Sequence, residues 1–396
     1  MEDYKPDGAY PEGYGYWGYG TSFNVLFGSA LERIFGNDFG LSDTEGYLKT
    51  GSYITHMIGS SGQAFNYSDV GNGASLNPAM FWFAQRNNDP SLLFTEKKLL
   101  ASGEKSMRQD RILPALMIWG KDLDFKKIAE PKDLTWVGQG KNPVAMLRTS
   151  WEDSTAIFVG FKAGSPSVSH GHMDVGSFVM DAGGQRWALD MGMQSYESLE
   201  SKGVKLWGKE QNAQRWEVYR YNNRAHNTLT FNDSLQRVGG YAKINSVTTQ
   251  PQFLSAISDI SELYKGQVKS AKRGIAIAEQ KYVTVRDEIE TGEKTTTVRW
   301  VMATSATVTL MDDGMAMLTQ KGKKLFLKIV APNVDVQKWE ATSKNSYDAP
   351  NKGITLVGFE AKLPKNSKHT LSVLLMPDMV YPMAILKGLP PLADWK

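Results

Sequence analysis

Cysteine is absent from the 396-residue sequence. Disulfide bonds and metal sites built from thiolates are therefore excluded, and a bound metal ion would need histidine, aspartate or glutamate ligands. Histidine is also scarce, because the chain contains only five. Each histidine can therefore be considered individually as a ligand or as an acid–base group.

Long hydrophobic runs are missing as well. No apolar stretch approaches the roughly 20 residues of a membrane-spanning helix, so we expect no membrane partner. Met1 is not followed by a signal peptide either. The chain opens instead with Glu2-Asp3-Tyr4-Lys5 and a tyrosine- and glycine-rich stretch, which predicts that an upstream helical portion of the protein is missing from this chain.

Charge of one sign is not concentrated anywhere. The net charge is +3, from 45 basic and 42 acidic residues, and no block of five or more basic residues occurs. This excludes the electrostatic footprint of a nucleic-acid-binding protein, although the small positive excess would help to attract a polyanion. The sequence also lacks a P-loop, a G-x-S-x-G elbow and a dinucleotide-binding fingerprint.

Glycine and aromatic residues are abundant, with 37 Gly, 16 Tyr, 16 Phe and 11 Trp. Aromatic rings on loops stack against flat faces such as those of sugar rings, which favours a carbohydrate-binding protein. Large β-domains also store aromatic residues in their cores. The composition therefore agrees with a sugar site, with a β-rich core, or with both.

Residues 1–125 are predicted to be helical. Apolar runs follow the start signals Thr21–Ser22, Asn77–Pro78 and Asp89–Pro90, and the first run ends at Gly36, as helices do. The helices have little polar face, so we expect them to pack against one another on several sides, as in helical bundles and toroids.

A polar segment at residues 126–140 is predicted as a linker. After it the hydrophobic period changes to two, which predicts an antiparallel β-sandwich over residues 141–396. The fold class is therefore α+β multidomain. The predicted strands are 144–151, 155–161, 177–181, 187–191, 226–231, 275–277, 282–289, 295–302, 306–311, 325–329, 354–359 and 370–375.

Three histidines and an aspartate form the first candidate constellation. His170 and His172 are two residues apart, so both imidazoles face one surface on an extended chain. His226 lies at the start of one predicted strand, and Asp190 lies near the end of another. Imidazoles and a carboxylate suit Zn²⁺ or another divalent ion. A hydrogen-bonded structural role for these side chains is the alternative.

A tyrosine-rich segment before the first predicted helix forms the second constellation. It includes Glu12, Tyr14, Tyr16 and Tyr19. A tyrosine can act as a general acid or base if neighbouring charges adjust its pKa. The alternative is a glycine- and tyrosine-rich loop that packs on the helices.

Three segments together resemble the heparinase II/III-like polysaccharide lyases. They are SHGHMDVGSFVMDAGGQRWALDMG (169–192), YNNRAHNTLTFNDSLQ (221–236) and DGAYPEGYGYWGYGT (7–21). The resemblance implies a partial (α/α) toroid followed by a large antiparallel β-sandwich, with the active site in the cleft between them. It also implies a bacterial protein that is periplasmic or secreted.

The activity implied by this resemblance is β-elimination on a uronate-containing acidic polysaccharide. The family's catalytic histidine matches His170, and its catalytic tyrosine matches Tyr16 as first choice and Tyr19 as second. Glu12, Trp207 and Arg224 are expected at the substrate. The sequence does not indicate which acidic polysaccharide is cut, nor an oligomeric state.

The resemblance further implies a structural zinc site. Its ligands would be His172, Asp190 and His226. One departure from the family pattern matters for the reaction: the group that neutralises the uronate carboxylate lies on a helix well before the tyrosine segment, and this chain has no counterpart there.

Two other functions remain as hypotheses. A glycoside hydrolase on a helical toroid would need two carboxylates beside the scissile bond, and Glu12 and Asp69 are the candidates in the helical half. A non-catalytic module that binds acidic glycans is the third hypothesis.

Overall fold

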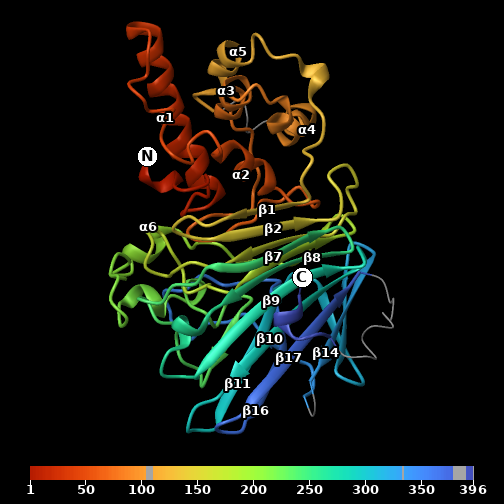
Figure 1. Cartoon of the computed structure of the whole chain (residues 1–396). Coiled ribbons are helices and arrows are strands. Elements are labelled where there is room, and N and C mark those ends of the chain that lie inside the picture. The colour runs from red at the N-terminus through yellow and green to blue at the C-terminus, as the bar shows by residue number, and fades with distance from the viewer. Residues whose placement is uncertain (104–109, 332–333, 378–388, 396) are drawn as a thin grey trace.

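The computed structural model describes residues 1–103, 110–331, 334–377 and 389–395. A helical N-terminal part lies against a set of large antiparallel sheets (Figure 1). No helix in these described ranges is long and apolar enough to cross a membrane. The α+β architecture predicted from the two hydrophobic periods is confirmed.

The helical part is built from short elements around one long helix. The long helix is α1 (Tyr14–Phe35). The other helices and 3₁₀ turns of this part are η1 (Glu2–Tyr4), α2 (Thr50–His56), α3 (Ala79–Arg86), η2 (Pro90–Leu93), α4 (Phe94–Ser102), η4 (Leu113–Ala115), α5 (Leu116–Trp119) and η5 (Phe125–Lys127).

Helix α1 begins earlier than the sequence signals indicate. The predicted start was at Thr21–Ser22, but the helix already begins at Tyr14, after Gly13 with φ 86°. Its buried side includes Tyr14, Trp17 and Val25, a spacing that keeps them on one face. The tyrosine-rich segment is therefore largely helical, and Tyr16 is held on a rigid element.

Three sheets follow. The five-stranded sheet has the order β1 (Thr135–Gly138), β2 (Val144–Arg148), β3 (Phe158–Lys162), β4 (Phe178–Ala182), β5 (Gln185–Ala188). The eight-stranded sheet has the order β12 (Thr307–Met311), β13 (Met315–Gln320), β14 (Lys323–Val330), β17 (Lys368–Met376), β10 (Tyr282–Glu290), β9 (Ser270–Ala278), β8 (Phe253–Asp259), β7 (Ile244–Gln250). The four-stranded sheet has the order β15 (Gln337–Glu340), β16 (Thr355–Leu363), β11 (Thr296–Thr304), β6 (Leu229–Phe231).

The segment predicted as a linker is partly a strand. Strand β1 lies within residues 126–140 and pairs with β2. A linker was expected because the segment is polar and contains proline, but Trp136 and Val137 pack against the two neighbouring cores. The helical part is therefore joined to the sheets without a long free connection.

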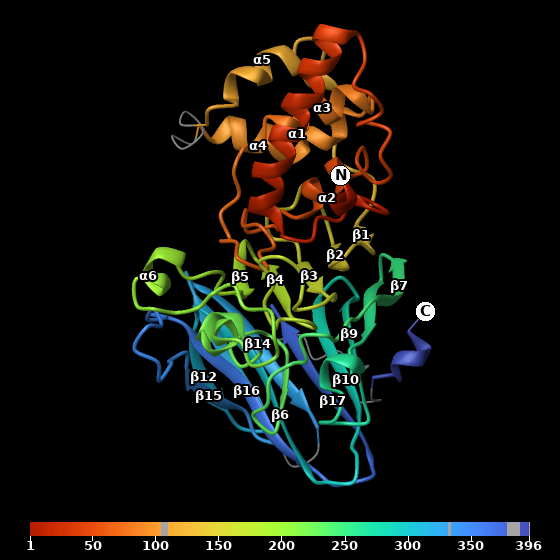
Figure 2. The same cartoon turned by 90° about the vertical axis from the view of Figure 1, so that its left-hand side faces the viewer.

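The five-stranded sheet is the middle layer of the molecule (Figure 2). Side chains alternate along β2, so that Val144 and Met146 belong to the core under the helices, whereas Ala145 and Leu147 belong to the core of the sandwich. Burial of each of the larger side chains, Val144, Met146 and Leu147, contributes about 1.5–3 kcal/mol to folding. This layer sets the position of the helices relative to the loops of the β-part.

Candidate active site

A cluster of polar and aromatic side chains lies where the helical part meets the loops of the β-part. Tyr16 comes from the first turns of α1, and Asp69 comes from the segment between α2 and α3. His170 lies between β3 and β4, and Tyr196 is the first residue of α6 (Tyr196–Glu200). Four segments that are remote in sequence therefore supply one site.

Tyr16 and His170 are in direct contact. Their rings are stacked with centroids 4.3 Å apart and an angle of 23° between the planes. The Tyr16 hydroxyl lies 3.0 Å from the Tyr196 hydroxyl, and this second hydroxyl lies 2.9 Å from His170 Nδ1. The phenol and the imidazole that the sequence analysis placed at the reaction are therefore neighbours, linked through Tyr196.

Asp69 is the centre of the hydrogen-bond network. Its buried carboxylate accepts from the Tyr196 hydroxyl at 2.7 Å and from Arg215 at 2.9 Å. It also lies 3.2 Å from His170 Nδ1 and 2.8 Å from His172 Nε2. A carboxylate with this many donors is held in one orientation.

The network decides the charge of Asp69. Burial alone would raise the pKa of its carboxyl group, but the hydrogen bonds from His170 and His172, together with the Arg215 guanidinium, hold this pKa well below its ordinary range. Asp69 is therefore ionised and acts only as an acceptor.

The pKa values of Tyr16 and Tyr196 are raised, in contrast to that of Asp69. Burial raises the pKa of Tyr16, and its hydrogen bond with Tyr196 opposes this effect only in part. Burial also raises the pKa of Tyr196, and its hydrogen bonds to Tyr16 and Asp69 add to the increase. Both phenols are therefore protonated near neutral pH and available as proton donors.

Arg215 and Trp207 frame the cluster. The Arg215 guanidinium donates to the Gly171 carbonyl and lies 4.5 Å from the centroid of the Tyr221 ring. The Trp207 ring is perpendicular to His170 at 5.8 Å and tilted against Tyr196 at 4.9 Å. Trp207 is 55% exposed, so its ring forms an accessible edge of the site.

The predicted zinc ligands also lie close together. The His226 Nδ1 atom is 2.7 Å from a carboxylate oxygen of Asp190, and the rings of His172 and His226 are 5.3 Å apart. Burial alone would lower the pKa of His226, but the Asp190 charge raises it above its ordinary value.

Two buried nitrogens in this set, His172 Nδ1 and His226 Nε2, have no hydrogen-bond partner among the residues that the structure describes. Unpartnered imidazole nitrogens beside a carboxylate suit zinc in their chemistry. As the side chains stand, however, the residues described in the structure contain no group of three or more His, Cys, Asp or Glu arranged to hold a metal ion. The donor types fit zinc, whereas their present arrangement is hydrogen-bonded.

Three other predicted residues are not brought into the cluster. Tyr19 is 66% exposed and its ring packs on Phe23, 5.2 Å away, so it does not share the position of Tyr16. Arg224 forms an ion pair with the exposed Asp233. Glu12 is half-buried in the turn before α1.

The sequence analysis gave Asp69 only a hydrolase role and gave Tyr196 none. Asp69 and His170 are 101 positions apart in the chain. A contact over this separation cannot be predicted from residue spacing. The concentration of aromatic residues between Tyr196 and Tyr221 was the one available signal.

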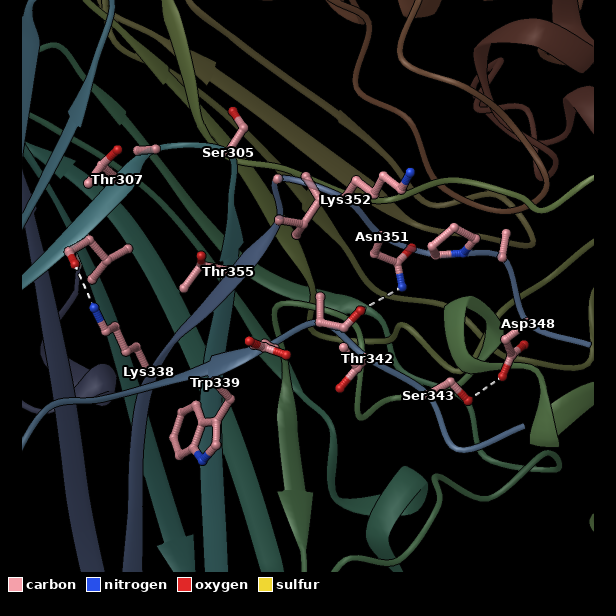
Figure 3. A pocket seen from close by; sticks show the side chains of 18 residues that line it. Ser305, Thr307, Lys338, Trp339, Thr342, Ser343, Asp348, Asn351, Lys352 and Thr355 are labelled. Atoms are coloured by element: carbon pink, nitrogen blue, oxygen red, sulfur yellow. Dashed lines mark hydrogen bonds between the residues drawn. The ribbon is translucent and has the colours of Figure 1, made fainter. Parts of the chain in front are cut away.

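A small cavity of about 50 Å³ is lined by His170, Trp207 and Arg215 of this cluster, whereas two larger cavities of the β-part lie beside it. A cavity of about 900 Å³ is lined by residues of β12, β15 and the segment 341–355, including Lys338 and Asp348 (Figure 3). A neighbouring cavity of about 550 Å³ shares Asn351 and Lys352 with it and extends to Asp190. Neither is lined by the residues of the Tyr16 contact.

Solved structures with similar folds include a heparan sulfate lyase and structures named heparinase III. The heparan sulfate lyase HepC from Pedobacter heparinus matches with a TM-score of 0.66 and 16% identity over 95% of this chain and 53% of that structure. A crystal structure of heparinase III matches with a TM-score of 0.65 and 11% identity over 95% of this chain and 55% of that one. At these identities the matches show the fold.

The chain spans about half the length of these solved structures. No curated protein matches it in sequence. The family model described as "Heparinase II/III-like, C-terminal" matches residues 145–355, which include His170, Asp190 and His226. By this match the chain belongs to the heparinase II/III-like family.

Proposed function

We propose that this protein is a polysaccharide lyase that cleaves uronate-containing acidic polysaccharides by β-elimination. The observation that carries the proposal is the stacking of Tyr16, from the helical part, on His170, from the β-part, at 4.3 Å. A phenol and an imidazole in contact can serve one sugar ring as a proton donor and a proton acceptor.

The reaction needs two proton movements. A base removes the proton from C5 of the uronate, the C4–O4 bond breaks, and an acid protonates the departing O4 oxygen. The product carries a C4–C5 double bond. The C5 proton is a weak acid, so stabilisation of negative charge on the uronate carboxylate is expected to be the largest single contribution.

The hydrogen bonds support one division of the two roles. Tyr196 uses its proton to bond Asp69, so the Tyr16 hydroxyl is the donor in the bond between the two phenols. A protonated Tyr16 suits the acid that protonates O4. His170 turns Nδ1 toward Asp69 and Tyr196, which leaves Nε2 as the base for the C5 proton.

Substrate binding and location belong to the same proposal. The exposed ring of Trp207 would stack on a sugar next to the reacting uronate. The group that neutralises the uronate carboxylate is proposed, from the family resemblance, to lie upstream of the tyrosine segment. A bacterial periplasmic or secreted location follows from the same resemblance.

We also propose that zinc binds at His172, Asp190 and His226. The two buried nitrogens without partners support this assignment. Bound zinc would supply a positive charge that holds these three side chains together. Elemental analysis of the purified protein tests it, and a protein that stays free of zinc after incubation with the ion would remove the assignment.

The state of Asp69 excludes it as the acid of a glycoside hydrolase, so a hydrolase at this site would need Glu12 for that role. A glycoside hydrolase needs one protonated carboxylic acid beside the scissile bond. The donors around Asp69 hold the pKa of its carboxyl group low, so it cannot supply this proton near neutral pH.

A screen of acidic polysaccharides tests the lyase function. Heparan sulfate, hyaluronan, chondroitin sulfate and alginate are incubated with the protein, and the ultraviolet absorbance of the new double bond is followed. We expect one of them to give unsaturated product, and we expect Tyr16→Phe and His170→Ala to lower its formation strongly. Release of reducing sugar without a double bond, or full activity in both variants, would overturn the proposal.

A further inference from the structure

Asp69 contacts both histidines of the His170-Gly171-His172 segment, one with each carboxylate oxygen. We propose that Asp69 is a positioning residue that decides which ring nitrogen of His170 and of His172 carries the hydrogen. This inference rests on the proposed function, because it assigns the lone pair of His170 that would act as the base.

The hydrogen bonds to Asp69 fix which ring nitrogens carry a hydrogen. An ionised carboxylate only accepts hydrogen bonds, so a nitrogen that bonds to it must carry a hydrogen. Oxygen Oδ1 faces His172 Nε2 at 2.8 Å, and oxygen Oδ2 faces His170 Nδ1 at 3.2 Å. Neutral His172 is therefore protonated on Nε2, and neutral His170 on Nδ1.

The nitrogen lone pairs of the two histidines then lie on different sides of the site. On His170 the lone pair is on Nε2, and this side chain keeps 21% of its surface exposed. On His172 the lone pair is on Nδ1, which is buried and has no hydrogen-bond partner within the described part of the chain. Asp69 thus leaves the His170 Nε2 lone pair free to act as the base. It leaves the His172 Nδ1 lone pair on the side of His226 and Asp190.

The backbone holds this arrangement in place. The Asp69 N–H donates to the His170 carbonyl oxygen at 3.1 Å, so the two segments are joined directly. His170 has a φ of 55°, a left-handed conformation that costs free energy in a non-glycine residue. Arg215 also donates to both Asp69 and the Gly171 carbonyl. The carboxylate is therefore fixed relative to both rings.

The first test needs no change at Asp69. The full chain is labelled with ¹⁵N-histidine, and long-range proton–nitrogen correlation spectra identify the protonated nitrogen of each ring. Single His→Gln variants assign the signals. We expect hydrogen on Nδ1 of His170 and on Nε2 of His172. The reverse tautomer at either residue would overturn the inference.

The second test is Asp69→Asn, which keeps the shape but replaces one oxygen by a donating NH₂ group. The amide oxygen should turn toward Arg215, Tyr196 and His170, because Arg215 offers only donors. The NH₂ group then faces His172 and requires a lone pair on its Nε2. We expect His172 to switch its hydrogen to Nδ1 while His170 keeps its tautomer.

A matched control is Asp181→Asn. Asp181 is also a buried carboxylate between the helical part and the sheet, bonded to Ser61 and Arg186, but no histidine contacts it in the described residues. It should lower the stability without changing any histidine tautomer. An unchanged His172 in a folded Asp69→Asn protein, or a switch in the control, would contradict the inference.

A zinc titration adds a second readout. If zinc uses His172 Nδ1, Asp69→Asn should weaken zinc binding by about 10–100-fold, whereas the control should not. The failure of this inference is distinguishable from that of the lyase function. The expected tautomers without any unsaturated product would sink the lyase function alone, and unsaturated product with the reverse tautomers would sink this inference alone.

Discussion

Two buried carboxylates of the helical part behave in opposite ways. Asp69, at the junction with the β-part, is surrounded by Arg215, two imidazoles and a phenol, and its pKa is lowered. Glu96, inside the helical part, accepts from the Asn77 N–H but has no cation beside it among the described residues, and burial raises its pKa to about 8. Burial costs both groups free energy, and the difference comes from the side chains that the second part of the chain supplies.

The two parts of the molecule accommodate a buried carboxyl group differently. The interior of the helical part tolerates a carboxyl group by keeping it protonated, whereas the junction keeps its carboxylate charged and uses it to orient donors. A site that holds a charge out of water needs residues from both parts of the chain.

The largest expected effect is on product formation at the junction between the helical part and the β-part. Tyr16→Phe removes the proposed acid while keeping the ring that stacks on His170, so formation of unsaturated product should fall by about 10²–10⁴-fold. Tyr19→Phe is the control and should retain full activity, since Tyr19 is exposed. Comparable losses in both variants would mean that α1 matters for folding rather than for chemistry.

The next largest expected effect is on the free energy of unfolding, and it comes from Glu96. Its pKa in the folded protein lies above its ordinary value of 4.5, so the folded state holds a proton that the unfolded state has lost. Between pH 4.5 and about 8 the free energy of unfolding should therefore fall as the pH rises, by about 1.4 kcal/mol per pH unit.

Glu96→Gln removes this titration and should stabilise the protein at pH 7 by roughly 1–3 kcal/mol. Urea unfolding at several pH values measures both effects. Glu152→Gln, at an exposed carboxyl group, is the control and should leave the pH dependence as it is. An equally steep pH dependence in Glu96→Gln would show that another group is responsible.

Tyr196→Phe is expected to have a smaller effect than Tyr16→Phe. It removes the hydroxyl that joins Tyr16 to Asp69 and to His170, but leaves the proposed acid and base in place. The loss of one bridging group should lower kcat about tenfold with little change in KM. Tyr241→Phe, whose hydroxyl bonds to a backbone carbonyl elsewhere, should not change either constant.

Trp207→Ala should have the smallest effect. The exposed ring borders His170 and Tyr196 without a hydrogen bond to either, so its loss should raise KM about 3–10-fold and leave kcat nearly unchanged. Trp207→Phe keeps an aromatic face and should recover most of the affinity. A fall in kcat alone would show that the ring orders the cluster rather than the sugar.

Much of the architecture could be read from the sequence. The change of period near residue 140 predicted helices followed by sheets, and most predicted strands match observed ones, such as 282–289 and β10. Strands β7 and β8 were not predicted. In β8 the serines at 255 and 258 are buried, so the alternation of polar and apolar residues is lost.

Only part of the candidate site could be predicted from the sequence. The motif around His170 and the tyrosine segment drew attention to the right segments, and the structure brings Tyr16 and His170 together. The early start of α1 separated Tyr16 from Tyr19, which no glycine or capping signal revealed. Zinc at His172, Asp190 and His226 stays a prediction.

The sequence by itself determined the periodicity of the elements, the absence of thiol chemistry and the few imidazoles and phenols on which a reaction could depend. Only the tertiary structure decided that Asp69 would meet His170, His172, Tyr196 and Arg215. Local spacing sets which side chains share a face of one helix or strand. Contacts between residues more than 100 positions apart depend instead on how the helical part packs on the five-stranded sheet.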